Sequence, residues 1–152
     1  MYSHYAKAYE NEKEKTENKM DQLLEISVDN FVSILKEYKI VVVDVWASWC
    51  NPCLAAGEKF LEFLSIFERY IESQDVIFVK DNIDREESVH VGNIEAVPCF
   101  FIYHEGVLFK KLTGFNMQDI GDTVENLLLG RFENPVSNSE ISPMKTETRF
   151  GV

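Results

Sequence analysis

The segment Ile40–Trp46 (IVVVDVW) constrains the fold of this chain more than any other feature of its sequence. A run of β-branched residues is typical of a strand that is buried on both faces, as in a parallel sheet covered by helices. The cysteines Cys50 and Cys53 follow directly, and apolar residues then recur at helical spacing as far as Tyr70. The sequence therefore predicts a buried strand that leads into one long helix, which begins at the cysteines.

The other predicted elements are shorter. Strands are expected at Gln22–Ile26, Val76–Val79, Cys99–Tyr103 and Val107–Leu112, the last two joined as a hairpin by a turn at Glu105–Gly106. Helices are expected from Ser27 or Asp29 to Tyr38, around Glu86–Val91, and over Met117–Leu129 before Gly130. This order predicts an α/β fold, with a central mixed sheet of roughly four to five strands and helices on both faces.

The length of 152 residues suits one domain, which we expect at residues 21–131, with an extension at each end. Residues 1–20 are highly charged and contain neither Gly nor Pro, so we expect a helical or disordered N-terminal extension. Residues 132–152 are rich in Pro, Ser, Asn and Thr, which predicts a disordered C-terminal tail.

The formal net charge of −11 argues against two classes of partner. An acidic protein is repelled by phosphate backbones and by anionic lipids, so neither nucleic acid nor a membrane surface is expected to bind it. No apolar run approaches the roughly 18–20 residues that span a bilayer, and the first twenty residues lack the apolar stretch of a signal peptide. We therefore expect a cytoplasmic protein.

The three cysteines indicate redox chemistry or metal binding, since an odd number in a chain of this size is not typical of a disulfide scaffold. A four-ligand zinc site would need two further ligands with suitable spacing. The remaining candidates are Cys99, His4, His90 and His104, which form no such pair. We expect neither a metal nor a bound cofactor, with the paired cysteines carrying the electrons themselves.

The junction between the predicted strand and the long helix suits thiol chemistry. A helix N-terminus favours a thiolate, and Cys50 lies at its tip. Cys53 is nearly one turn further on the same face, within disulfide reach, and Pro52 has a backbone angle suited to the first turn. We predict that Cys50 attacks a substrate disulfide and that Cys53 resolves the mixed disulfide.

Several motifs in register resemble the thioredoxin family. The segment Val43–Cys53 (VDVWASWCNPC) is similar to its active-site signature, and Val79–Asp84 (VKDNID) is similar to its central strand. Val97–Pro98 lies where the family keeps a cis-proline opposite the dithiol, and Gly106 and Gly114 match its two late glycines. The resemblance covers most of the chain and implies the thioredoxin fold.

The resemblance also implies roles for residues around the cysteines. Asp44 corresponds to the buried carboxylate that assists deprotonation of Cys53, and an acid inside a buried strand is expected to have a raised pKa. Lys80 corresponds to a buried lysine that can partner this carboxylate, and a plain surface lysine is the alternative. Trp49 resembles the flat apolar rim beside the nucleophile, and Trp46 is either its supporting wall or plain core.

Further positions concern substrate binding, the redox potential and regulation. By resemblance, the backbone of Val97 pairs with a bound substrate strand, and Pro98 is expected to be cis. Asn51 replaces the usual Gly between the cysteines, so the family's redox potential cannot be transferred. Cys99 replaces the usual Thr after the cis-proline and is either a small buried residue or a regulatory thiol.

The resemblance implies a protein-disulfide reductase that acts on disulfide-containing client proteins and is itself reduced by a thioredoxin reductase. Two alternatives stay open from the sequence. One is a specialised redox protein, oxidase- or isomerase-like, with a dedicated client. The other is a thioredoxin-like adaptor that uses the fold as a binding scaffold.

Overall fold

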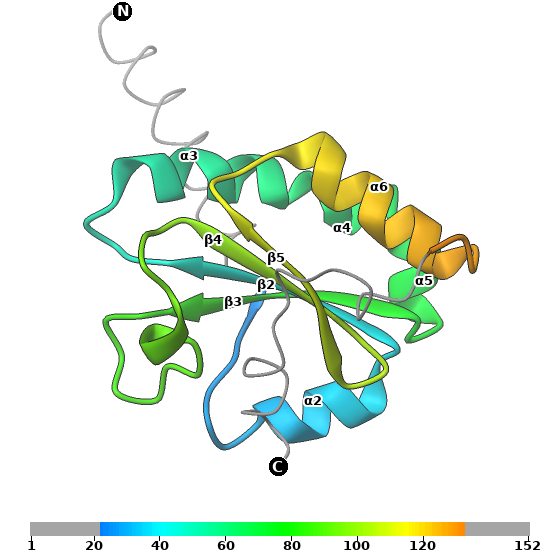
Figure 1. Ribbon diagram of the computed structural model, residues 1–152, viewed down its shortest axis with the longest axis horizontal. Helices are drawn as coiled ribbons and strands as arrows, with labels where there is room; N and C mark the ends of the chain where they lie inside the picture. Colours follow the sequence, from blue (N-terminus) through cyan, green and yellow to red (C-terminus); the bar gives the residue numbers. More distant parts are fainter. Residues whose placement is uncertain (1–21, 133–152) are drawn as a thin grey trace, which may run out of the picture.

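The computed structural model describes residues 22–132 as a five-stranded sheet with helices on both faces (Figure 1). The strands lie in the order β1 (Leu24–Glu25), β3 (Val76–Asn82), β2 (Ile40–Trp46), β4 (Cys99–His104) and β5 (Val107–Thr113). The pairs β1–β3 and β3–β2 are parallel, whereas β2–β4 and β4–β5 are antiparallel. The mixed sheet predicted from the sequence is confirmed.

The helices form two layers. Helix α2 (Phe31–Glu37) covers one face of the sheet, and α3 (Asn51–Phe60), α4 (Glu62–Ile66) and α6 (Met117–Leu128) cover the other. Helix α5 (Glu68–Glu72) follows α4 and leads into β3. No described helix has the length and apolarity that a membrane crossing would require.

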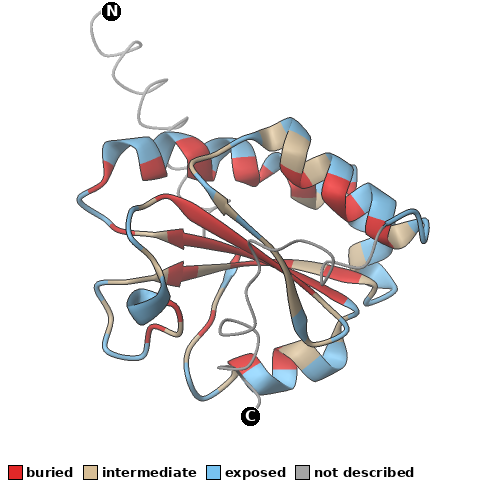
Figure 2. Cartoon of the chain, viewed as in Figure 1, coloured by how far each residue is buried: buried red, intermediate tan, exposed pale blue. Residues whose placement is uncertain are grey.

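The alternation of side chains along β2 explains why the whole strand is apolar. Val41, Val43 and Val45 pack in the cluster beneath α2, whereas Ile40 and Val42 pack in the cluster beneath α3. Both faces are therefore excluded from water, and Figure 2 shows the central strands as the most buried part of the chain.

The prediction of one long helix as far as Tyr70 is wrong, because the segment is three consecutive helices. The breaks lie at Leu61 and Phe67, and the latter has φ −108° and ψ 23°. Both side chains are buried in the core beneath α3 and α4. A straight helix would move away from the sheet, so the chain bends to keep its apolar residues in contact with it.

The helix predicted around Glu86–Val91 is also absent, and a single 3₁₀ turn at Val91–Asn93 stands nearby. The backbone N–H groups of Val89 and His90 donate to Oδ2 of Asp81, at 3.1 and 2.8 Å, rather than to helical carbonyls. A buried carboxylate on β3 therefore shapes this loop.

The remaining elements agree with the prediction to within a few residues. Strand β3 continues to Asn82, beyond the predicted end at Val79. Glu105 and Gly106 have φ values of 53° and 80°, which suit the tight turn of a hairpin. The predicted extensions at residues 1–20 and 132–152 lie outside the described residues, apart from Phe132.

Candidate active site

The cysteine pair lies where β2 ends and α3 begins, as predicted. Cys50 is the N-cap residue of α3, and its Sγ accepts a hydrogen bond from the backbone N–H of Cys53 at 3.1 Å. The two sulfurs are joined in a disulfide, and Pro52 occupies the first turn of the helix. The positive end of α3 therefore points at the Cys50 sulfur, which favours its thiolate once the disulfide is reduced.

The two cysteines differ in how far they are covered. Cys50 is 6% exposed and Cys53 is 1% exposed, so Cys53 is the more recessed of the pair. Both pack against a small apolar cluster that contains Ala47, Trp46, Ile83 and Val97. Access from solvent is therefore through Cys50.

Trp49 forms an exposed apolar surface next to the dithiol. Its side chain is 68% exposed, and its Nε1–H donates to Oδ1 of Asp84 at 2.9 Å. The backbone N–H of Ser48 donates to the other oxygen of the same carboxylate at 3.2 Å. The hydrogen bond from Trp49, with those from Ser48, holds the pKa of Asp84 below its ordinary value. Asp84 was not singled out from the sequence, although it ends the VKDNID motif.

The segment Val97–Pro98 lies next to the dithiol, although Val97 is 47 residues from Cys50 in the sequence. The Val97–Pro98 peptide bond is cis, as expected, and the carbonyl oxygen of Val97 lies 3.8 Å from Cys50 Sγ. The carbonyl of Pro98 accepts a hydrogen bond from the N–H of Gly114 at 2.9 Å, which ties the segment to the end of β5. A backbone carbonyl therefore lies directly beside the sulfur that is nearer to solvent.

Asp44 is a buried acid on the face of β2 that α3 covers. It is 3% exposed, and its Oδ1 has no hydrogen-bond partner among the described residues. Burial raises the pKa of Asp44 to about 8, the charge of Glu25 adds to this rise, and Lys80 opposes it. Lys80 lies opposite Asp44 on β3, with its Nζ 5.9 Å from the centre of the Trp46 ring. The structure thus places the predicted pair side by side.

Cys99 lies apart from the dithiol. It is buried in the layer beneath α2, opposite Val45 in the sheet, and belongs to a different cluster from Cys50 and Cys53. Burial raises the pKa of its thiol, an effect that Lys111 partly opposes. Burial therefore favours the neutral thiol over the thiolate at Cys99.

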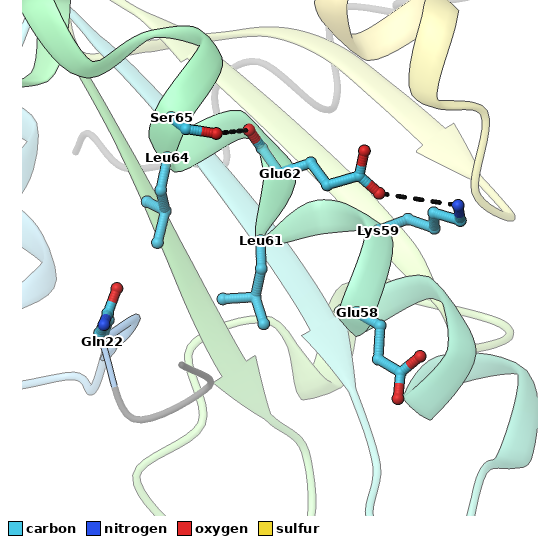
Figure 3. Close-up of a pocket in the computed structure, with 7 residues that line it drawn as sticks. All are labelled: Gln22, Glu58, Lys59, Leu61, Glu62, Leu64 and Ser65. Atoms are coloured by element: carbon cyan, nitrogen blue, oxygen red, sulfur yellow. Dashed lines mark hydrogen bonds and ion pairs between the residues drawn. The ribbon is translucent and has the colours of Figure 1, made fainter. Parts of the chain in front are cut away.

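A surface groove lies apart from the dithiol. This groove has a volume of about 430 Å³ and lies between the start of β1 and the helices α3 and α4, lined in part by Gln22, Leu61 and Leu64 (Figure 3). None of its lining residues belongs to the dithiol cluster. Within residues 22–132, no three His, Cys, Asp or Glu side chains are grouped so that they could hold a metal ion.

The sequence did not predict a buried chain of hydrogen-bonded side chains that lies beneath α2. Nδ1 of His90 lies 2.7 Å from Oδ2 of Asp81, and Nε2 of His90 lies 2.7 Å from the hydroxyl of Tyr103. Asp81 lies between Lys80 and Asn82 at the polar end of β3, so its immediate sequence did not mark it as buried. Its partners come from distant segments, so no local pattern could have identified them.

Known proteins share this sequence and architecture. The family model described as Thioredoxin matches residues 22–126. Thioredoxin-1 of Schizosaccharomyces pombe is 34% identical over 87 residues, which cover 57% of this chain and 79% of the relative. Thioredoxin Asp f 28 of Aspergillus fumigatus is 34% identical over 106 residues, which cover 67% of this chain and 93% of that protein.

Solved structures agree with these sequence matches. The long form of thioredoxin f from spinach chloroplast superposes with a TM-score of 0.58 at 26% identity, covering 76% of this chain and 93% of that one. Oxidised mitochondrial thioredoxin 3 from Saccharomyces cerevisiae gives a TM-score of 0.60 at 22% identity, covering 71% of this chain and 98% of that one, which supports the fold alone. The architecture is the thioredoxin fold predicted from the sequence. Because the family model spans most of the described residues and a Cys-x-x-Cys dithiol begins α3, the chain belongs to the thioredoxin family and is a thioredoxin-type dithiol oxidoreductase of the protein-disulfide reductase class.

Proposed function

We propose that this protein reduces disulfides of client proteins, with Cys50 as the attacking thiolate and Cys53 as the resolving thiol. The observation that carries the proposal is the position of Cys50. It caps α3, its Sγ accepts the N–H of Cys53, and it is the less covered of the two sulfurs. Each of these features favours a nucleophilic thiolate at Cys50 and a retained thiol at Cys53.

The reaction proceeds in two thiol–disulfide exchanges. The Cys50 thiolate attacks one sulfur of the client disulfide, the second client sulfur leaves as a thiolate and takes up a proton, and a mixed disulfide forms. Cys53 then attacks Cys50 Sγ, which closes the Cys50–Cys53 disulfide and expels the remaining client sulfur as a thiolate. This thiolate takes up a proton, which completes the client dithiol. Asp44, whose pKa is about 8, accepts the proton that Cys53 gives up, because its basicity is close to that of a thiol.

The surroundings of Cys50 supply the contacts for a client. The carbonyl of Val97, held next to Pro98, is placed to pair with the backbone of an extended client segment. Trp49, directly before Cys50 in the chain, offers an exposed apolar surface. Asn51 and Pro52 are exposed at the tip of α3 and form the remainder of the rim.

We further propose that a flavin-containing thioredoxin reductase, using NADPH, returns the dithiol to its reduced state. A reductant of this kind works in a compartment that keeps thiols reduced, such as the cytoplasm. Relatives carry names that place them in other compartments, including thioredoxin F of the rice chloroplast. The cytoplasmic assignment is therefore tested by locating the full chain in its own cells.

Insulin reduction with dithiothreitol tests the proposed activity. The wild-type protein should accelerate precipitation of the insulin B chain well beyond dithiothreitol alone, and Cys50→Ser should abolish the acceleration. Cys99→Thr is the matched control and should retain it, because Cys99 lies in the other layer of the core. A wild-type rate equal to that of dithiothreitol alone would refute the proposal. Replacing dithiothreitol by NADPH and a thioredoxin reductase tests the electron donor separately.

A further inference from the structure

Three charged residues form a row across neighbouring strands. Glu25 on β1 lies opposite Lys80 on β3, and Lys80 lies opposite Asp44 on β2. Paired residues of parallel strands project to the same face, so all three side chains lie on the face that α3 covers, with the lysine in the middle. Since neighbouring strands are about 4.8 Å apart, the backbones of Glu25 and Asp44 are separated by about 10 Å.

Few other charges face Asp44. On its second side in the sheet it lies opposite Phe100 of β4, which is apolar. Among the buried residues of α3, the group able to titrate is Cys53, and it titrates only when the disulfide is reduced. Within the described residues, the charges that bear on Asp44 are therefore those of Lys80 and Glu25, and its burial means that solvent screens them weakly.

Glu25 is fixed at the outer end of the row. Its Oε2 accepts a hydrogen bond from the backbone N–H of Asn82 and lies 3.4 Å from Nη1 of Arg85. The same Nη1 donates to the carbonyl of Ile26 at 3.3 Å. Burial raises the pKa of Glu25, whereas the contacts with Asn82, Lys80 and Arg85 oppose that rise and favour the carboxylate.

We propose that Glu25 is a positioning residue of the dithiol reaction, which draws the Lys80 ammonium away from Asp44 and leaves the Asp44 carboxyl able to take and return a proton. The inference rests on the proposed role of Asp44. Without Glu25, the ammonium would act on no other acid in the row, so the pKa of Asp44 would be lower and its carboxylate a weaker base for the proton of Cys53. The charge of Glu25 adds to the raised pKa of Asp44, as this requires.

Glu25→Gln tests the proposal, since it removes one negative charge and keeps an oxygen that can accept the Asn82 hydrogen bond. The titration midpoint of the Asp44 carboxyl is followed by carbon-13 NMR in the oxidised full-length protein, and its signal is assigned by its loss in Asp44→Asn. The midpoint should fall by roughly half a unit to one unit, because a charge that opposes ionisation is gone. Glu25→Ser, a second neutral variant, should give the same fall.

Two controls separate the charge of Glu25 from general effects. Glu87 is the other acidic partner of Arg85, and Glu87 lies outside the row. Glu87→Gln should therefore leave the titration midpoint of Asp44 unchanged. Glu25→Asp keeps the charge and should restore most of the wild-type midpoint. An unmoved midpoint in the neutral variants, or an equal fall in Glu87→Gln, overturns the proposal. The midpoint is measured without turnover, so such a result leaves the disulfide reductase function, tested with insulin, intact.

Discussion

Nδ1 of His90 lies 2.7 Å from Oδ2 of Asp81, inside the apolar layer beneath α2. The hydroxyl of Tyr103 completes the chain at Nε2 of the same imidazole. Burial opposes ionisation of Asp81, but hydrogen bonds from the side chain and backbone of His90 outweigh it and hold the pKa of Asp81 below its ordinary value. Asp81 therefore stabilises the fold as a carboxylate, and it shapes the loop that precedes Val97.

Tyr103→Phe should lower the free energy of unfolding by about 1–2 kcal/mol. The substitution keeps the ring, which packs in the apolar layer, and leaves Nε2 of His90 without its partner in a buried position. Urea denaturation measures the difference. Tyr70→Phe, at an exposed tyrosine, is the matched control and should change stability by only a few tenths of a kcal/mol. Equal effects of the two substitutions would show that the buried hydroxyl contributes nothing.

Stability should fall at acid pH in a way that depends on Asp81. Its pKa is lower in the folded than in the unfolded protein, so its contribution is complete above the ordinary Asp value of about 4 and is lost as pH falls through the folded value. Asp84 contributes in the same direction. Urea denaturation between pH 2 and 6 should therefore show a shallower acid decline for Asp81→Asn than for wild type. Parallel declines would contradict the assignment.

The parts of the molecule that could be predicted from the sequence are those set by local pattern. The β-branched run predicted β2, and the junction between this strand and the cysteines predicted that Cys50 lies at the tip of α3. Both features depend on neighbouring residues alone. The resemblance supplied the role of Asp44 within the same motif, and it also supplied Lys80 and Pro98, which lie far from the cysteines in sequence.

The parts that could not be predicted depend on contacts between distant segments. The helix breaks at Leu61 and Phe67 follow from packing on the sheet. The predicted helix near His90 is absent because the backbone N–H of His90 donates to the Asp81 carboxylate instead of a helical carbonyl. The role proposed for Glu25 likewise needs the register of β1 against β3, which a short polar-flanked strand does not specify.

Asp44→Asn should stabilise the protein by an amount that grows with pH. The pKa of Asp44 is about 8 in the folded protein, so between about pH 4 and that value the folded chain keeps a proton that the unfolded chain loses, and wild-type stability decreases as pH rises. The difference between variant and wild type should therefore increase by about 1.4 kcal/mol per pH unit in this window. A constant difference would place the carboxyl in contact with water. The same substitution should slow resolution by Cys53 and spare the first attack by Cys50.

Cys99 should resist alkylation for as long as the protein is folded. In the oxidised protein it is the free thiol of the described residues, it is buried, and its pKa is raised by that burial. Iodoacetamide at neutral pH should modify it only after urea is added, as followed by intact-protein mass spectrometry. Peroxide should inactivate wild type and Cys99→Thr equally. Rapid alkylation of the native protein, or protection from peroxide by the substitution, would instead identify Cys99 as a regulatory thiol.

The most direct test of the central claim asks which sulfur forms the mixed disulfide. Cys53→Ser and Cys50→Ser are made in a Cys99→Thr background, incubated with insulin, quenched with acid and analysed by intact-protein mass spectrometry. Cys53→Ser should accumulate a mixed disulfide through Cys50, because the attacking sulfur at the tip of α3 is kept and the resolving thiol is gone. Cys50→Ser should trap little, since its remaining thiol is recessed. Equal trapping by both variants, or trapping by Cys50→Ser alone, would contradict the assignment of Cys50 as the nucleophile.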